Sequence, residues 1–114
     1  MNKPNAINYI EFTAEDLSAV KDFYSNAFGW TFTDYGPEYV AFNDGALDGG
    51  FAQGSAAGEG GPLVILFSDN LEASLETVVK YGGTIAREIY SFPGGRRFHF
   101  KDPAGNELAV WSDK

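Results

Sequence analysis

The chain has 114 residues, enough for one domain with a continuous core and too few for two independent ones. Because it contains no cysteine, disulfides, thiolate metal sites and cysteine nucleophiles are excluded. The net charge of −8 disfavours nucleic-acid binding and favours cationic small molecules, although the residues after 79 carry a slight basic excess. We expect a cytoplasmic protein, since no apolar run could span a bilayer and the first residues lack the apolar stretch of a signal peptide.

The first half of the chain predicts a strand, a helix and three further strands. Residues 6–13 are rich in strand-forming side chains. Residues 16–28 place apolar side chains at three- and four-residue steps, which predicts a helix that ends at Gly29. Thr13 and Asp16 have the spacing of a capping box, with Asp in place of the usual Glu. Turn-forming residues divide the remainder into short strands near 30–35, 38–43 and 47–53.

The second half repeats this order of elements. Residues 62–68 form an apolar strand, and Asp69 or Asn70 caps a helix that stops at Gly82 and Gly83. Three further strands are expected near 84–91, 96–101 and 107–112. At an offset of 54 residues, several residue types recur in register: Leu17 with Leu71, Ala19 with Ala73, and Gly29 with Gly83. Such internal symmetry predicts a duplicated module.

Residues 54–61 are composed of small and flexible residues and read as a linker. They contain none of the glycine motifs that cradle phosphate, and no helix follows them directly, so a hinge is the better interpretation. We therefore expect one domain over 1–114, with module one at about 6–53, the linker at 54–61 and module two at about 62–112.

Two motifs in this frame resemble the vicinal oxygen chelate superfamily, which includes glyoxalases, bleomycin resistance proteins and extradiol dioxygenases. Residues 98–108 contain an aromatic-x-Asp-Pro-x-Gly-Asn turn, and residues 22–30 contain Phe-Tyr and Phe-Gly-Trp pairs at a helix exit. The turn has a structural reason, because Pro fixes φ and Gly permits a positive φ. The resemblance implies an α+β fold in which two βαβββ modules form a curled, open, barrel-like sheet of eight strands around a central groove.

In metal-using members of this superfamily, His, Glu or Gln side chains bind a divalent ion in that groove. By the resemblance, the four ligand positions fall on Tyr9, on Leu63, on Ala109 and near 50–52. Alanine and leucine cannot coordinate a metal, and a neutral tyrosine is a poor ligand. His99, the single histidine, is offset from these positions. We therefore expect neither a metal nor another cofactor.

Strand alternation and the resemblance together suggest what lines the groove instead. Alternation places Glu11 on the face of Tyr9, and Trp111 on the face of Ala109. Resemblance to fosfomycin-resistance members places Arg97 and His99 on the groove face, and alternation then turns Arg96 to the opposite face. Packing in the core remains an alternative for Trp111, and a role in the sheet remains one for His99. We expect Arg97 or His99 to pair with Glu11, and the candidate ligand pocket is Tyr9, Glu11, Phe51, Leu63, Arg97, His99 and Trp111.

Three functions follow from this interpretation. The preferred one is a metal-free protein that encloses a small, partly aromatic ligand, as the bleomycin-resistance members do. The alternative is an enzyme of the same superfamily, such as a lyase, isomerase, dioxygenase or thiol transferase, in which Glu11 and His99 could carry out acid–base work. The third is a structural or regulatory module without a ligand. A homodimer is expected, because an open sheet leaves edges to cover and aromatic residues make up 16% of the chain.

Overall fold

A computed structural model describes residue 4 and residues 9–55 and 62–114, so the start of the predicted first strand and most of the predicted linker lie outside the described residues. The described chain contains two helices and eight strands, in the predicted order. The first module comprises β1 (Tyr9–Ala14), α1 (Leu17–Phe28), β2 (Thr31–Asp34), β3 (Tyr39–Asn43) and β4 (Asp48–Gln53). The second comprises β5 (Val64–Phe67), α2 (Leu71–Lys80), β6 (Thr84–Phe92), β7 (Gly95–Lys101) and β8 (Glu107–Ser112).

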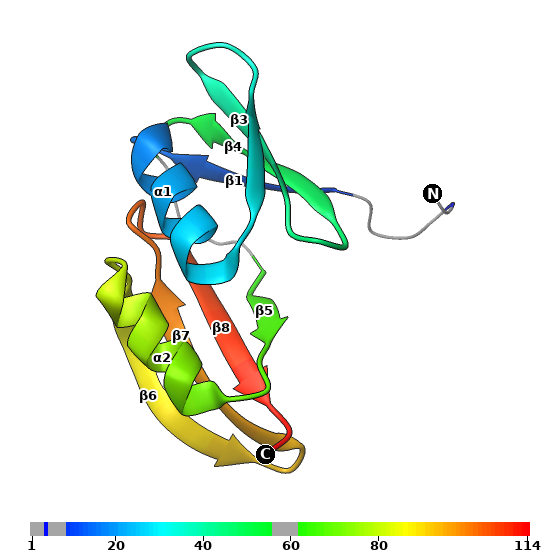
Figure 1. The fold of residues 1–114 in the computed structure, drawn as a ribbon, viewed down its shortest axis with the longest axis vertical. Coiled ribbons are helices and arrows are strands. Elements are labelled where there is room, and N and C mark those ends of the chain that lie inside the picture. Colours follow the sequence, from blue (N-terminus) through cyan, green and yellow to red (C-terminus); the bar gives the residue numbers. More distant parts are fainter. Residues whose placement is uncertain (1–3, 5–8, 56–61) are drawn as a thin grey trace.

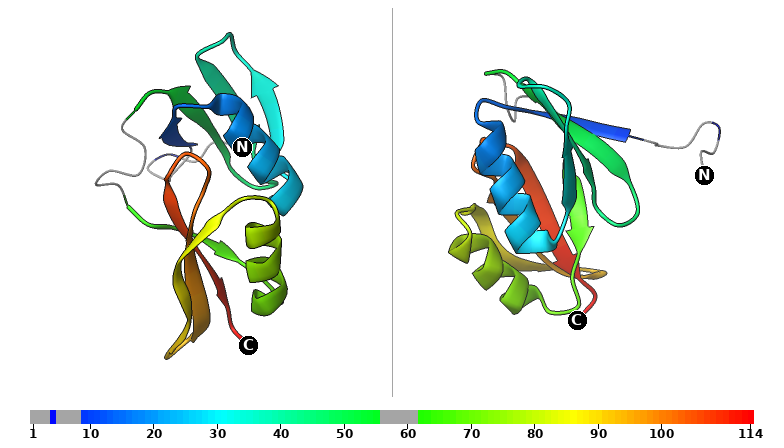
Figure 2. Two further views of the ribbon diagram at one scale, coloured as in Figure 1. Left: turned by 90° about the vertical axis from the view of Figure 1, so that its left-hand side faces the viewer. Right: turned by 45° about the horizontal axis from the view of Figure 1, so that its top comes forward.

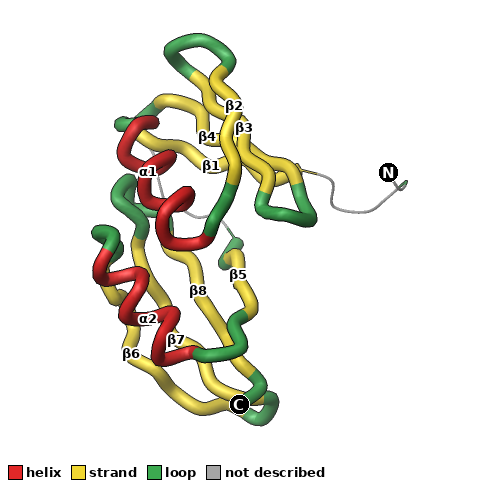
Figure 3. The backbone as a smooth tube through the Cα atoms, viewed as in Figure 1, coloured by secondary structure: helices red, strands yellow, loops and turns green. Residues whose placement is uncertain are grey.

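The strands form two four-stranded sheets of the same topology (Figures 1 and 3). Their orders are β1-β4-β3-β2 and β5-β8-β7-β6. In each sheet the first strand pairs in parallel with the last, and the other pairs are antiparallel. The expected α+β class with two βαβββ modules is confirmed, but the strands are divided between two sheets. Within the described residues β1 and β5 each pair with another strand on one side only. They do not pair with each other, so the two sheets are separate.

The two helices begin with equivalent caps, 54 residues apart. The Asp16 side chain accepts from the backbone N–H of Ala19, and the Asn70 side chain accepts from that of Ala73, each at 3.1 Å. The capping-box interpretation of Thr13 is wrong, because Thr13 belongs to β1 and the N-cap of α1 is Asp16. Gly29 ends α1 with φ of 74°, as predicted. Neither helix of the described chain is long and apolar enough to cross a membrane.

An aromatic core fills the first module on the helix side of its sheet. The Tyr24 ring stacks on Trp30 and Trp30 stacks on Phe42, each with ring centres 4.4 Å apart. Phe51 is fully buried among them, 5.2 Å from the Phe12 ring. The structure therefore corrects the expected place of Phe51 in the groove. Alternation in β4 turns its side chain toward α1, away from the face that carries Tyr9.

The modules are joined through α1 and the turn between β7 and β8. Both helices lie on the same side of the molecule (Figures 1 and 2), and the rings of Phe23 and Phe28 on α1 each lie 5.9 Å from that of Phe100 on β7. The Tyr24 hydroxyl donates to Asp102 Oδ2 at 3.0 Å. Asn106 Nδ2 donates to the carbonyl of Thr13 at 2.9 Å. The turn is therefore structural, as its sequence indicated, and it also holds the two modules together.

Asp102 is the ionisable group at the centre of this joint, and it is 5% exposed. Burial raises the pKa of its carboxyl, and hydrogen bonds from Asn106, Tyr24 and Ala104 oppose that shift without cancelling it. The pKa of the Tyr24 hydroxyl is raised well above its ordinary value, by burial first and then by the carboxylate beside it. The hydroxyl therefore remains a donor. Its hydrogen bond stabilises the ionised carboxyl of Asp102 more than the protonated one.

Replacing Tyr24 with phenylalanine should destabilise the protein by about 1–3 kcal/mol at neutral pH, because a buried carboxylate loses a donor. Since the folded-state pKa of Asp102 is raised, its ionisation lowers stability as the pH rises through that pKa. Removing the donor deepens this loss. The destabilisation by Tyr24→Phe should therefore be smaller at acidic pH, where the carboxyl is protonated. Urea unfolding at both pH values measures this. The control Tyr35→Phe alters a ring that is 65% exposed, and an equal loss there would contradict the prediction.

Candidate functional site

Each sheet has an outer face, defined here as the face opposite the helix-side core. On the outer face of the first sheet, two phenols and a carboxyl form a chain of hydrogen bonds. The hydroxyl oxygens of Tyr9 and Tyr39 lie 2.5 Å apart, and the Tyr39 hydroxyl donates to Glu11 Oε1 at 3.0 Å. Because Tyr39 donates to Glu11, the proton between the phenols comes from Tyr9. The pKa of Tyr39 is raised well above its ordinary value, first by desolvation and then by its bonds to Tyr9 and Glu11.

Gly50 makes room for this phenol pair. In the sheet it lies between Glu11 on β1 and Ala41 on β3. A Cβ atom at position 50 would collide with the Tyr39 hydroxyl and would lie 2.7 Å from that of Tyr9. Any side chain at this position would therefore displace the two hydroxyls.

A cleft of about 310 Å³ adjoins the phenol pair. Most of its polar lining consists of hydroxyl groups, and Asp48 adds a carboxylate that accepts from Asn43 Nδ2 at 2.8 Å. Its lining residues are Tyr9, Thr31, Thr33, Tyr35, Ala41, Phe42, Asn43, Asp48 and Gly49. The outer face of the first sheet thus offers hydrogen-bond acceptors and negative charge.

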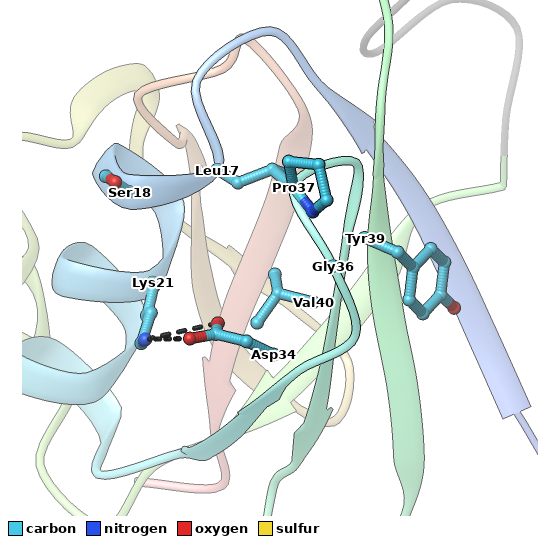
Figure 4. Close-up of a pocket in the computed structure, with 8 residues that line it drawn as sticks. All are labelled: Leu17, Ser18, Lys21, Asp34, Gly36, Pro37, Tyr39 and Val40. Carbon is cyan, nitrogen blue, oxygen red and sulfur yellow. Dashed lines mark hydrogen bonds and ion pairs between the residues drawn. The ribbon is translucent and has the colours of Figure 1, made fainter.

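A second cavity, of about 200 Å³, lies on the helix side between α1 and the β2–β3 hairpin (Figure 4). Lys21 Nζ contacts both carboxylate oxygens of Asp34 at 3.2 Å. Figure 4 shows the Tyr39 ring pointing away from this cavity. None of the residues predicted for the groove lines it, and its charged groups are already paired with each other, so we assign it no site.

On the outer face of the second sheet, four polar side chains form a continuous chain. His99 Nδ1 lies 2.9 Å from Glu107 Oε2, and His99 Nε2 lies 2.9 Å from the Tyr90 hydroxyl. Arg97 Nε donates to that same hydroxyl. Because a carboxylate can only accept, His99 donates from Nδ1 to Glu107, and its Nε2 is left to interact with the Tyr90 hydroxyl.

These contacts correct the expected partner of Glu11. The Tyr39 hydroxyl donates to the Glu11 carboxylate, whereas Arg97 and His99 have partners within the second sheet. Arg96 does lie off the outer face, as predicted, but it is not a free surface charge. It forms a two-pronged ion pair with Glu72 of α2, at 2.5 and 3.2 Å, and this pairing lowers the pKa of Glu72.

Apolar side chains surround the polar chain of the second sheet. Leu63, Ile65 and Phe67 are 37%, 42% and 54% exposed, respectively. The Trp111 ring lies between two other rings, 5.2 Å from that of Phe67 and 6.2 Å from that of Phe92. In the sheet Trp111 is the direct neighbour of Arg97 on β7. A basic and aromatic surface thus takes in three of the predicted residues: Arg97, His99 and Trp111.

Tyr39, Arg87 and Tyr90 were missed from the sequence. Register shifts interrupt the pairing of β6 with β7 on both sides of Arg87, so Arg87 opposite His99 and Tyr90 opposite Arg97 share the outer face at a spacing of three. Strict alternation would have placed these two residues on opposite faces. For Tyr39 the signal was present, since alternation along β3 puts it on the face of Ala41, but the resemblance did not point to it.

The residues at the implied ligand positions do not fit a metal. Tyr9 offers a single phenol that is already hydrogen bonded, and Leu63 and Ala109 have no donor atom. At Gly50 the space for a ligand side chain is occupied by the tyrosine hydroxyls. Within residues 9–55 and 62–114, no three side chains of His, Cys, Asp or Glu are grouped to hold an ion.

Comparison with known proteins identifies the fold and the family. No curated protein matches the chain in sequence. Solved structures match closely in shape at 14–20% identity, which establishes the fold alone. A glyoxalase/bleomycin resistance protein/dioxygenase family enzyme from Burkholderia phytofirmans has 16% identity to this chain and a TM-score of 0.81. The match covers 94% of this chain and 98% of that one. A glyoxalase-related enzyme from Fulvimarina pelagi has 20% identity and a TM-score of 0.80, covering 95% and 88%.

A third structure, lactoylglutathione lyase from Agrobacterium tumefaciens, has 20% identity and a TM-score of 0.73, covering 97% of this chain and 96% of its own. The family model of the glyoxalase/bleomycin resistance protein/dioxygenase superfamily matches residues 6–110, nearly the whole sequence. With the two βαβββ modules described above, this match shows that the chain belongs to the glyoxalase/bleomycin resistance protein/dioxygenase superfamily.

Proposed function

We propose that this chain is a metal-free cytoplasmic protein that binds a small, partly aromatic molecule on the outer faces of its sheets. The observation that carries the proposal is the second-sheet surface. Exposed Phe67 lies beside half-buried Trp111, next to polar groups whose positions are fixed by hydrogen bonds. A rigid apolar floor with a few oriented polar groups is the usual composition of a small-molecule site.

The alternative, an enzyme of the same superfamily, is favoured by one feature. The Glu107 carboxylate orients the His99 ring, whose other nitrogen lies 2.9 Å from the Tyr90 hydroxyl. This order of acid, imidazole and hydroxyl is the arrangement by which a base prepares an oxygen to give up a proton. The expected pair of Glu11 and His99 is not supported, since no hydrogen bond joins them in the described residues.

We further propose that the protein acts as a homodimer. Exposed apolar side chains lie on the outer face of the second sheet, while hydroxyl and carboxylate groups lie on that of the first. The edges of β1 and β5 are unpaired in the described chain. A second copy could cover the apolar side chains and the edges together.

Light scattering at micromolar concentration should give twice the mass of the chain. The double variant Ile65→Ser, Phe67→Ser should shift the mass toward that of a single chain, because it removes exposed apolar surface from β5. A monomer mass for the unaltered protein would contradict the proposal.

Ligand binding can be read from the indole N–H signals in a nitrogen–proton NMR spectrum, because the chain has only two tryptophans. Titration with the neutral probe 2-naphthol should shift the Trp111 signal and leave that of Trp30, which is 7% exposed in the core, unmoved. Phe67→Ser should weaken binding, whereas Tyr81→Ser, at another exposed ring, should not. Equal effects of the two variants would place the probe elsewhere.

The purified protein should contain no stoichiometric zinc, nickel, iron or manganese. The physical reason is the donor set at the implied ligand positions, where leucine, alanine and glycine offer no coordinating side chain. Elemental analysis after dialysis measures this, and about one retained ion per chain would contradict it.

A further inference from the structure

The second-sheet surface brings two guanidinium groups to one phenol ring. The Arg87 Cζ atom lies 3.7 Å from the centre of the Tyr90 ring, in a cation–π contact. Arg97 donates from Nε to the Tyr90 hydroxyl, and its Cζ lies 5.5 Å from the ring centre of Tyr90 and 5.7 Å from that of Phe92. Tyr90 thus holds both positive groups on the same outer face.

Neither of these arginines has a carboxylate partner among the described residues. The ion pairs there are Lys21 with Asp34, Arg96 with Glu72, and His99 with Glu107. Carboxylates are not scarce, since the chain has 16 acidic residues against 8 basic ones. Glu107, the nearest acid in the hydrogen-bonded chain, is held on the far side of the His99 ring. Within the described residues, both guanidiniums are therefore available to a partner from outside the chain.

The hydrogen bonding of the surface shows which donors are available. The Tyr90 hydroxyl accepts from Arg97 and is hydrogen bonded to His99, so its hydrogen-bonding capacity is used within the surface. Arg97 uses only Nε within the described chain, which leaves its two terminal nitrogens free. Arg87 contacts the Tyr90 ring by a cation–π interaction and makes no side-chain hydrogen bond to the described residues, so its N–H groups are available as well. Guanidinium edges match the planar geometry of a carboxylate.

We propose that this surface binds an aromatic carboxylate, with its carboxylate at Arg87 and Arg97 and its ring against Trp111. Trp111 is the neighbour of Arg97 across the β7–β8 ladder, so an anion and an attached ring would each meet a suitable group. The inference rests on the proposed function and specifies the class of its ligand.

The net charge of −8 does not prevent such binding. Charges are screened over about 8 Å at physiological ionic strength, whereas the molecule is 41 Å long. Acidic groups much more than about 8 Å away therefore contribute little to the potential at the two arginines. The expectation of a cationic ligand, which came from net charge, applies better to the outer face of the first sheet, where Glu11 and Asp48 lie.

The test compares two probes that share a ring system and differ in charge, 2-naphthoate and 2-naphthamide, by isothermal titration calorimetry on the full chain. Naphthoate should bind at least about tenfold more tightly, because its hydrogen bonds to guanidinium are charge-assisted. This advantage should shrink as the salt concentration rises. The Trp111 indole signal should shift with both probes.

Variants separate the charge from the fold. Arg87 is exposed, so Arg87→Met should leave the protein folded, weaken naphthoate severalfold and leave naphthamide unchanged. The control Arg96→Met removes a guanidinium that is paired with Glu72 off the outer face and should change neither affinity. Equal affinities for the two probes would overturn the inference and leave the proposed function standing. Equal losses from Arg87→Met and Arg96→Met would also overturn it. If neither probe binds, both proposals fail.

Discussion

The carboxylate of Asp102 is buried where the two modules meet, and a buried charge is tolerated only when its hydrogen bonds are made. Two of its partners are backbone N–H groups of its own turn, at Ala104 and Asn106, which shape the connection between β7 and β8. A third is the Tyr24 hydroxyl on α1, from the other module. One side chain therefore sets both the local turn and the seat of the first helix on the second sheet.

This joint also positions the outer face of the second sheet. The turn fixes the register in which His99 is opposite Ala109 and Arg97 is opposite Trp111. The neighbouring side chains Phe98 and Phe100 point to the helix side of the sheet and are fully buried, so core packing supports the strands that carry the polar chain. The site is thus supported by a rigid strand pair, which is the kind of scaffold that keeps a few polar groups in fixed orientation.

The sequence predicted the parts of the structure that depend on local chemistry. Duplicated helix starts, glycine stops and the Asp-Pro-x-Gly-Asn turn are determined by backbone preferences of a few residues, and these predictions agree with the structure. The resemblance and alternation together placed Arg97, His99 and Trp111 on one face. The resemblance located the fourth ligand position only to residues 50–52, and Phe51 from that range is buried in the core. At β6, bulges change the period on which alternation depends. The partner of Glu11 depended on which sheets face each other, and no local pattern encodes that.

Gly50 links the chemistry of the first sheet to one of the implied ligand positions. The volume above its Cα holds the hydroxyls of Tyr9 and Tyr39, and the same volume would have to hold any side chain projecting from that position. A coordinating residue and the phenol pair are therefore mutually exclusive occupants of one space. A single carbon at position 50 is therefore enough to decide whether the phenol pair can form.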